Sequence, residues 1–146
     1  RGIDAGIILT QTAIERLCFA HSFENGKFIS LDGFNKLAAA DRFRLLFASL
    51  NIPQEIPALL TETTKLAKEH TWVDAPQALT EMRNEKVHPQ HKKRGKFDAA
   101  IYEAWTFGLW YVEMVLLRLC GYSGLYVNRL ASTRGVGEVE KVPWAS

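Results

Sequence analysis

The chain has 146 residues, of which 47% are hydrophobic and 23% are charged. This length and composition are typical of a single globular domain that buries a sizeable core. The net charge of +2 is too small to indicate a nucleic-acid-binding protein by itself, so such a function would have to depend on local clusters of positive charge.

Apolar residues recur at helical spacing through the first half of the chain. A first helix is predicted over residues 4–23, with Asp4 as its N-cap, because an aspartate side chain accepts hydrogen bonds from the free backbone amides of a first turn. A second helix is predicted over residues 35–50. A third covers residues 57–69 and begins at a proline, which the first turn of a helix tolerates.

Two further helices are predicted in the second half. Asp74 caps the fourth, which ends at His88 because Pro89 disfavours helical geometry in the residue before it. The fifth begins at residue 97 or 98 and ends at residue 119. It is apolar around most of its circumference, so it is either central in a bundle or shared with a partner. Gly108 within it could let another helix approach closely, or it could be incidental.

No long helix is predicted after residue 124. A short strand or hairpin near residues 138–142 is one reading, but a tail that packs against the bundle is preferred. The predicted fold class is therefore all-α: an up-and-down bundle of four to five helices with an irregular C-terminal tail. We expect residues 1–146 to form one domain, and because the chain begins at Arg1 we expect it to be the C-terminal part of a longer protein.

The remaining composition gives no sign of a disulfide, a metal site or a membrane span. Cys18 and Cys120 lie far apart in apolar helical patterns, so we expect buried thiols, as in a reducing compartment. The pair His88 and His91 has no partner cysteines, so neither a metal nor a cofactor is predicted. The longest charge-free apolar stretch, residues 104–112, is too short to span a bilayer, and a cytoplasmic location is expected.

The end of the fourth predicted helix gathers the residues with the most potential chemistry. Asn84 and His88 are four residues apart and share a helix face, and Arg83 lies about 100° around the axis from Asn84. A histidine at a helix C-terminus can act as acid or base near neutral pH, and arginine offers a charged fork for phosphate oxygens. This set could cut a phosphodiester without a metal. Alternatively, Arg83 only pairs with Glu81 or Glu85, and His88 only caps the helix.

A basic run follows directly. Residues 86–96 contain five Lys or Arg, two His and no acidic residue, which could bind RNA phosphates or could form a solvated loop. The candidate RNA-binding residues are Lys86, His91, Lys92, Lys93, Arg94 and Lys96. Four aromatic residues could stack on RNA bases, although aromatics at helical spacing are more often part of a core. They are Trp72, Trp105, Trp110 and Tyr111.

The segment from Arg83 and Asn84 to His88 resembles the R-x(4–6)-H motif of HEPN domains (higher eukaryotes and prokaryotes nucleotide-binding), in which Asn, Asp or His often follows the arginine. The helix count, the chain length and the apolar last helix are similar too. The tail, G-Y-x-G-x-Y-x-N-R at residues 121–129 and V-P-W at residues 142–144, looks like the HEPN subfamily at the C-terminal end of ApeA-like bacterial defence proteins.

This resemblance implies an all-α homodimer that faces two motifs across a cleft. Many similar domains are metal-independent endoribonucleases of toxin–antitoxin, abortive-infection or CRISPR systems, which serve antiviral defence. The resemblance implies that Arg83 and His88 are catalytic, and that Asn84 positions or polarises the reacting groups. The implied partners are a second copy of the chain, an RNA substrate, and an antitoxin or an N-terminal partner domain.

Three functions are therefore weighed. The leading hypothesis is an endoribonuclease that cleaves RNA by 2′-OH attack at a composite site in a homodimer. The alternative is a non-catalytic helical module that dimerises a larger defence protein or binds a partner. A sensor of a small phosphate ligand is the weakest, because the sequence has no Gly-rich phosphate loop.

Overall fold

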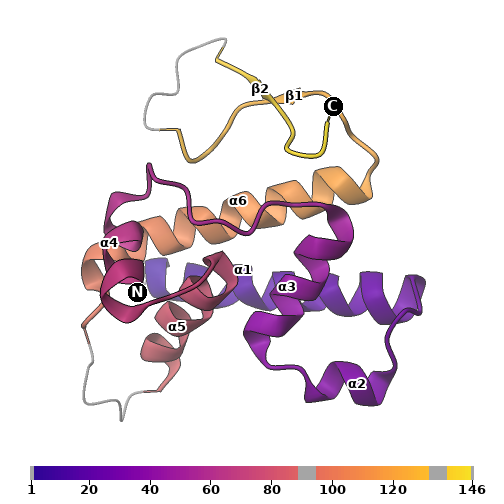
Figure 1. Cartoon of the computed structure of the whole chain (residues 1–146), viewed down its shortest axis with the longest axis horizontal. Coiled ribbons are helices and arrows are strands. Elements are labelled where there is room, and N and C mark those ends of the chain that lie inside the picture. The colour runs from indigo at the N-terminus through magenta and orange to yellow at the C-terminus, as the bar shows by residue number, and fades with distance from the viewer. Residues whose placement is uncertain (1, 89–94, 132–137, 146) are drawn as a thin grey trace.

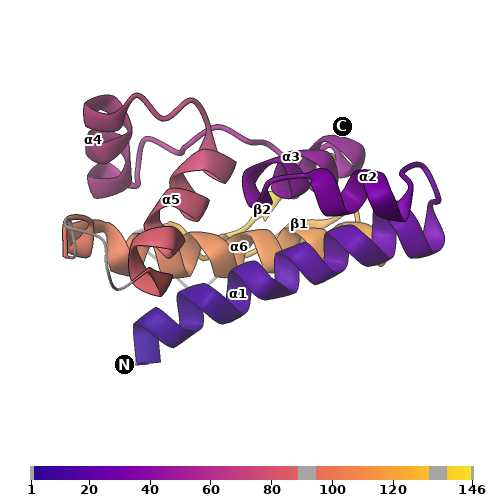
Figure 2. The ribbon, with the colours of Figure 1, turned by 90° about the horizontal axis from the view of Figure 1, so that it is seen from below.

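Two long helices lie side by side at the centre of the molecule. In the computed structural model, which describes residues 2–88, 95–131 and 138–145, these are α1 (Gly2–Phe19) and α6 (Ile101–Leu119) (Figures 1 and 2). Their close approach depends on glycine. A Cβ atom on Gly108 would lie 2.6 Å from Thr10 Oγ1, and one on Gly6 would lie 2.5 Å from Trp105 Nε1. The sequence-based suggestion that Gly108 admits another helix is therefore confirmed.

The other helices pack on one side of this pair. They are α2 (Leu31–Lys36), α3 (Ala39–Leu50), α4 (Thr61–His70) and α5 (Ala75–Val87), and Figure 2 shows them as a second layer over α1 and α6. The predicted all-α bundle with a C-terminal tail is confirmed, and the described residues form six α-helices. None of the helices in this part of the chain is long and apolar enough to cross a membrane.

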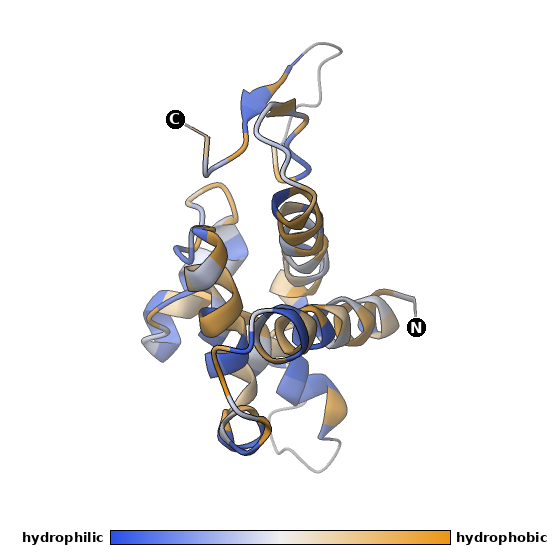
Figure 3. Cartoon of the chain, turned by 90° about the vertical axis from the view of Figure 1, so that its right-hand side faces the viewer, coloured by the Kyte–Doolittle hydropathy of each residue, from blue (hydrophilic) through white to orange (hydrophobic). Residues whose placement is uncertain are grey.

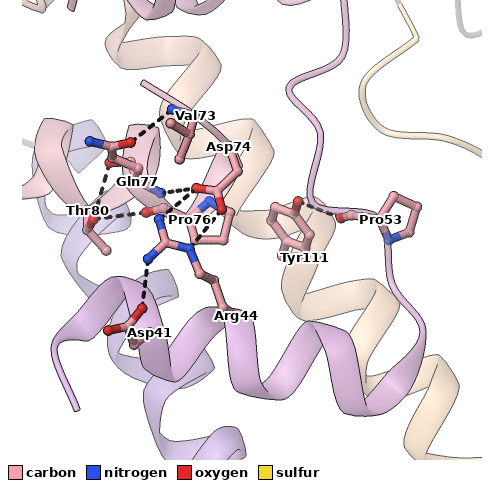
Figure 4. A network of polar contacts seen from close by, with 9 residues as sticks. All are labelled: Asp41, Arg44, Pro53, Val73, Asp74, Pro76, Gln77, Thr80 and Tyr111. Atoms are coloured by element: carbon pink, nitrogen blue, oxygen red, sulfur yellow. Dashed lines mark hydrogen bonds and ion pairs between the residues drawn. The ribbon is translucent and has the colours of Figure 1, made fainter. Parts of the chain in front are cut away.

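The core lies between the two layers and is centred on aromatic residues of α3 and α6. The rings of Phe47 and Tyr111 stack with their centroids 4.0 Å apart, and the Phe107 ring also stacks on Tyr111, with centroids 4.8 Å apart. The Tyr111 hydroxyl donates a hydrogen bond to the Pro53 carbonyl at 2.8 Å (Figure 4). Figure 3 looks nearly along α6 and shows hydrophobic residues on it in orange, and eight of its residues from Ile101 to Val115 are buried, which explains its central place.

Several predicted boundaries were wrong for identifiable reasons. Asp4 lies inside the first turn of α1 rather than at its N-cap, and after Phe19 the helix continues as a π-helical segment (Ala20–Asn25). The second predicted helix is two helices. Ser30 caps α2 by accepting a hydrogen bond from the Gly33 amide, and the extended backbone at residues 37–38 separates α2 from α3.

The third predicted helix begins later than its proline suggested. The carboxylate of Glu103 on α6 accepts hydrogen bonds from the backbone amides of Glu62 and Thr63, at 3.2 and 2.7 Å, and from the Thr63 hydroxyl at 2.7 Å. These bonds satisfy the free amides of the first turn of α4. The start of α4 is therefore fixed by a side chain from a distant helix, and Pro57 lies before it.

Helix α5, by contrast, begins where the sequence predicted. Asp74 is its N-cap and accepts a hydrogen bond from the Gln77 amide at 3.0 Å, while the Gln77 side chain accepts one from the Val73 amide (Figure 4). Arg44 on α3 binds the same Asp74 carboxylate through two nitrogens, at 2.7 and 3.0 Å, and also binds Asp41. The start of α5 is thus joined firmly to α3.

The C-terminal tail packs against α6, as predicted, and contains a two-residue antiparallel pairing of β1 (Leu125–Tyr126) with β2 (Glu140–Lys141). The indole of Trp110 donates a hydrogen bond to the Tyr126 hydroxyl at 3.1 Å, which ties β1 to α6. A 3₁₀ turn, Asp98–Ala100, precedes α6. Both cysteines are free thiols. Cys18 is buried as predicted, but Cys120 is exposed because it follows the last turn of α6.

Candidate functional site

The last two turns of α5 carry Arg83 and Asn84, and the structure brings these two side chains together. Arg83 Nη2 donates to Asn84 Oδ1 at 3.4 Å, and Arg83 Nη1 lies 3.4 Å from Glu15 Oε2 on α1. Only 16% of the Arg83 side chain is exposed. The alternative pairing of Arg83 with Glu81 or Glu85 is therefore wrong, because the acidic partner comes from another helix.

Glu15 lies between two arginines. Its second oxygen, Oε1, is 3.4 Å from Arg42 Nη1 on α3, and the Arg42 guanidinium covers the Phe34 ring at 4.5 Å. Both ion pairs are longer than the roughly 2.7–2.9 Å of a strong charge-assisted hydrogen bond. Two guanidinium groups facing one carboxylate leave an excess of positive charge, and neither arginine forms a strong ion pair with Glu15.

His88 lies at the end of the same helix, in a different setting. It is the C-cap residue, its backbone amide donates to the Asn84 carbonyl at 3.1 Å, and its side chain is exposed. Within the described ranges, the His88 ring forms no hydrogen bond or ion pair. Positions 83 and 88 are about 140° apart around a helix axis. One copy of the chain therefore joins Arg83 to Asn84 but does not bring His88 into contact with Arg83.

Lys86, predicted to bind RNA, is engaged by carboxylates. Its Nζ lies 2.8 Å from Asp98, 3.6 Å from Glu85 and 3.8 Å from Asp4. Burial alone would lower the pKa of Lys86, but the hydrogen bond to Asp98 and the charges of Glu85 and Asp4 outweigh it and raise the pKa. Lys86 thus ties the end of α5 to α1 and to the turn before α6, and an RNA contact would have to compete with these bonds.

The rest of the predicted basic surface is described only in part. Lys96 is exposed, and its Nζ lies 5.8 Å from the centroid of the Phe97 ring. The other candidates lie outside the described residues; they are His91, Lys92, Lys93 and Arg94.

Among the aromatic candidates for stacking, Trp110 and Tyr111 are buried in the core, whereas Trp72 and Trp105 are only partly buried. In the described ranges, no group of three or more His, Cys, Asp or Glu is placed to hold a metal ion.

Comparison with known proteins shows the family to which the chain belongs. The profile of the YopA C-terminal domain matches residues 1–141. The chain belongs to this family. Across 145 residues it is 30% identical to the "SPbeta prophage-derived uncharacterized protein YopA" of Bacillus subtilis (strain 168), in an alignment that covers 97% of the chain. The chain spans only 32% of the length of that relative. No solved structure matches it.

In this YopA C-terminal domain, sequence reasoning missed the residues that surround Arg83. Glu15 is 68 positions away in the chain, and Arg42 belongs to a third helix. The one local signal for Glu15 is its position directly after Ile14, at the edge of the buried side of α1, where a partly buried charge needs a partner. No spacing in the sequence indicates which partner that is.

Proposed function

We propose that this domain is a metal-independent endoribonuclease of the HEPN type, which cleaves RNA by 2′-OH attack at a composite site in a homodimer. The proposal depends on one observation: a pair formed by the largely buried Arg83 and by Asn84 lies one turn before an exposed His88 on the same helix. Arginine binds phosphate oxygens through its planar fork, and histidine transfers protons near neutral pH. The resemblance of these residues to the R-x(4–6)-H motif supports the same reaction.

In the proposed reaction, a neutral His88 imidazole accepts the proton of a ribose 2′-OH, and the 2′-oxygen attacks the adjacent phosphorus. The bond between phosphorus and the 5′-oxygen of the next nucleotide breaks, and a protonated imidazole from the second copy protonates that oxygen. The products are a 2′,3′-cyclic phosphate and a 5′-OH end. The Arg83 guanidinium stabilises the negative charge that develops on the phosphorus centre, and Asn84 orients it.

A second copy is required because His88 and Arg83 occupy different sides of one helix. In a dimer that brings two α5 ends together, His88 of one copy would face Arg83 of the other. An apolar surface is available for such a contact at the end of α5, since Val87 of α5 and Ile3 of α1 remain 39% and 37% exposed, and Ile3 lies beside Lys86. The loose ion pair of Arg83 with Glu15 is compatible with its release toward a phosphate group.

We place the domain in the conflict between bacteria and phages. The Bacillus subtilis relative is prophage-derived by its name. We therefore propose a cytoplasmic enzyme of a bacterial defence or toxin–antitoxin system, regulated by an antitoxin or by an N-terminal partner region. RNA is the proposed substrate.

The experiment is an RNA cleavage assay in the presence of EDTA. The wild-type protein should produce 5′-OH ends, and His88→Gln and Arg83→Lys should each reduce the rate by at least about 100-fold, the usual contribution of a catalytic acid, base or charge stabiliser. Arg16→Lys is the matched control, because Arg16 of α1 forms an exposed ion pair with Glu24 in the π-helical segment, so this substitution should leave the cleavage rate unchanged. An RNA substrate with a single 2′-deoxyribose at the cleavage site should not be cleaved. Equal cleavage by the His88→Gln protein would overturn the proposal.

The alternative is a non-catalytic helical module that dimerises or binds a partner in a larger defence protein. It is favoured by the ion pair of Arg83 with Glu15, which links α5 to α1 as a structural contact would. In that case Arg83→Lys would lower the melting temperature, size-exclusion chromatography would still show a dimer, and no variant would change any RNA cleavage.

A further inference from the structure

A pocket of about 130 Å³ lies beside Asn84, on the side of α5 that faces α4 and residues 95–97. One part of its wall is aromatic. The His70 ring stacks on Trp72 with centroids 5.4 Å apart and an interplanar angle of 26°, and Phe97 meets both rings edge-on at 5.4 Å. The pocket is therefore lined by flat, rigid side chains that can stack on another ring.

The rest of the wall consists of the polar face of α5 and of Lys96. Glu81, Asn84 and Glu85 all line the pocket, and spacings of three and four residues place them on one side of the helix. The exposed Glu81 carboxylate forms no hydrogen bond or ion pair within the described residues. In the same part of the chain, His70 Nε2 is buried and has no hydrogen-bond partner.

The orientation of the Asn84 amide follows from its neighbour. Arg83 has only hydrogen-bond donors, so the Asn84 atom that it contacts must be the carbonyl oxygen. The Asn84 NH₂ group is then left as a donor. The face of α5 therefore offers one donor from Asn84 beside two acceptor oxygens from Glu81.

The size and the chemistry of the pocket together specify a ligand. An engineered protein cavity of about 150 Å³ binds benzene, so this pocket of about 130 Å³ accepts the six-membered ring of a base, and the five-membered ring of a purine would remain outside it. Guanine presents a carbonyl oxygen, one N–H and an NH₂ group in sequence along its Watson–Crick edge, which matches one donor followed by two acceptors. Adenine and cytosine each present one ring-nitrogen acceptor beside one amino donor, so each leaves one Glu81 oxygen without a partner, and uracil directs its second carbonyl oxygen at that position.

We propose that this pocket binds the guanine base of a single-stranded RNA, stacked against Trp72 and recognised by Glu81 and Asn84. The choice of RNA as the source of the base rests on the proposed nuclease function. Since Asn84 contacts both the pocket and Arg83, a base held here would place its own phosphate near the guanidinium. The enzyme would then cut next to guanines.

Binding is tested without cleavage by ¹⁹F NMR of protein that contains 5-fluorotryptophan, with the Trp72 signal assigned from a Trp72→Phe variant. Titration with 5′-GMP should shift the Trp72 signal, and the affinity should be at least tenfold higher than for 5′-IMP, which lacks only the NH₂ group, or for AMP, CMP and UMP. Glu81→Gln should reduce the affinity for GMP to that for IMP. Glu69→Gln is the matched control, because Glu69 is also exposed but is not one of the residues that line the pocket.

The results separate this inference from the nuclease proposal. No shift at Trp72, or equal affinity for all five nucleotides, overturns the guanine pocket whether or not RNA is cut. If GMP binds selectively but RNA is never cleaved, the pocket stands and the nuclease proposal fails. A non-cleavable 2′-O-methyl GpU dinucleotide distinguishes the source of the base. It should bind more tightly than GMP, and weaker binding would overturn RNA as that source.

Discussion

The network at the start of α5 permits a quantitative prediction. Asp74 has two roles: it caps α5 through the Gln77 amide, and it pairs with Arg44 of α3 through two hydrogen bonds (Figure 4). The two roles can be separated by substitution. Asn is as good an N-cap as Asp but carries no charge, so Asp74→Asn removes the ion pair alone, whereas Asp74→Ala removes both.

The magnitudes follow from burial. Loss of a cap costs about 1 kcal/mol. The ion pair is intermediate between exposed and buried, since 20% of the Asp74 side chain and 33% of the Arg44 side chain are exposed. Screening by solvent therefore limits its contribution to the free energy of unfolding to about 1 kcal/mol. We expect the free energy of unfolding to fall by about 1 kcal/mol in Asp74→Asn and about 2 kcal/mol in Asp74→Ala, or roughly 3 and 6 °C in melting temperature.

The pH dependence gives an independent check. Burial alone would raise the pKa of Asp74, but the hydrogen bonds from Arg44 and from the Gln77 amide outweigh it and lower the pKa below the ordinary value of 3.8. Because the folded-state pKa is the lower one, the carboxylate stabilises the fold above pH 3.8, and this stabilisation is lost as the pH falls through the folded-state pKa. The difference between wild type and Asp74→Asn should therefore shrink in acid.

The assay is urea unfolding followed by circular dichroism at neutral pH and at a series of acidic pH values, with an Arg44→Gln variant to complete a double-mutant cycle. Equal losses in Asp74→Asn and Asp74→Ala would show that the cap contributes nothing of its own. A difference between wild type and Asp74→Asn that persists undiminished into strong acid would refute the ion-pair argument.

Two further predictions concern α6. Tyr111→Phe removes the hydrogen bond to Pro53 and should lower the free energy of unfolding by about 1 kcal/mol, measured by urea unfolding at neutral pH. Because burial raises the pKa of Tyr111 well above 10.0, wild-type stability should also fall as the pH rises above 10.0, and less so in this variant. Gly108→Ala forces a Cβ against Thr10 and should cost about 1–3 kcal/mol, measured in the same way. Gly2→Ala is the control: the added Cβ meets no atom within 4 Å, so the free energy of unfolding should not change.

The parts of the fold that the sequence predicts are those fixed by local interactions. The start of α5 depends on Asp74 and a residue three positions later, and the apolar periodicity of α6 lies within one helix. The start of α4 depends instead on Glu103, 41 positions after Glu62. Helix α2 is only six residues long, too short for an apolar period to be recognised. Its N-cap, Ser30, was the available signal.

The candidate site divides in the same way. The spacing of Arg83 and Asn84 on one helix correctly predicts that they lie together, because both belong to one turn. That Arg83 meets Glu15, or that His70 and Phe97 lie across a pocket from Asn84, depends on the packing of separate helices. Helical periodicity indicates which side of a helix is buried, but it does not indicate which other helix covers it.

The contrast between two arginines explains why Arg83 is the better candidate for catalysis. Arg44 binds two carboxylates at 2.7–3.0 Å, so both of its hydrogen-bonding edges are used within the fold, and burial of Asp74 strengthens the attachment. Arg83 has two contacts of 3.4 Å, one with an amide and one with a carboxylate that Arg42 also engages. Holding a guanidinium weakly costs little stability, yet it leaves the fork able to form shorter bonds with a phosphate group. A catalytic role requires stronger interaction with the transition state than with the resting protein, and only the second arrangement allows it.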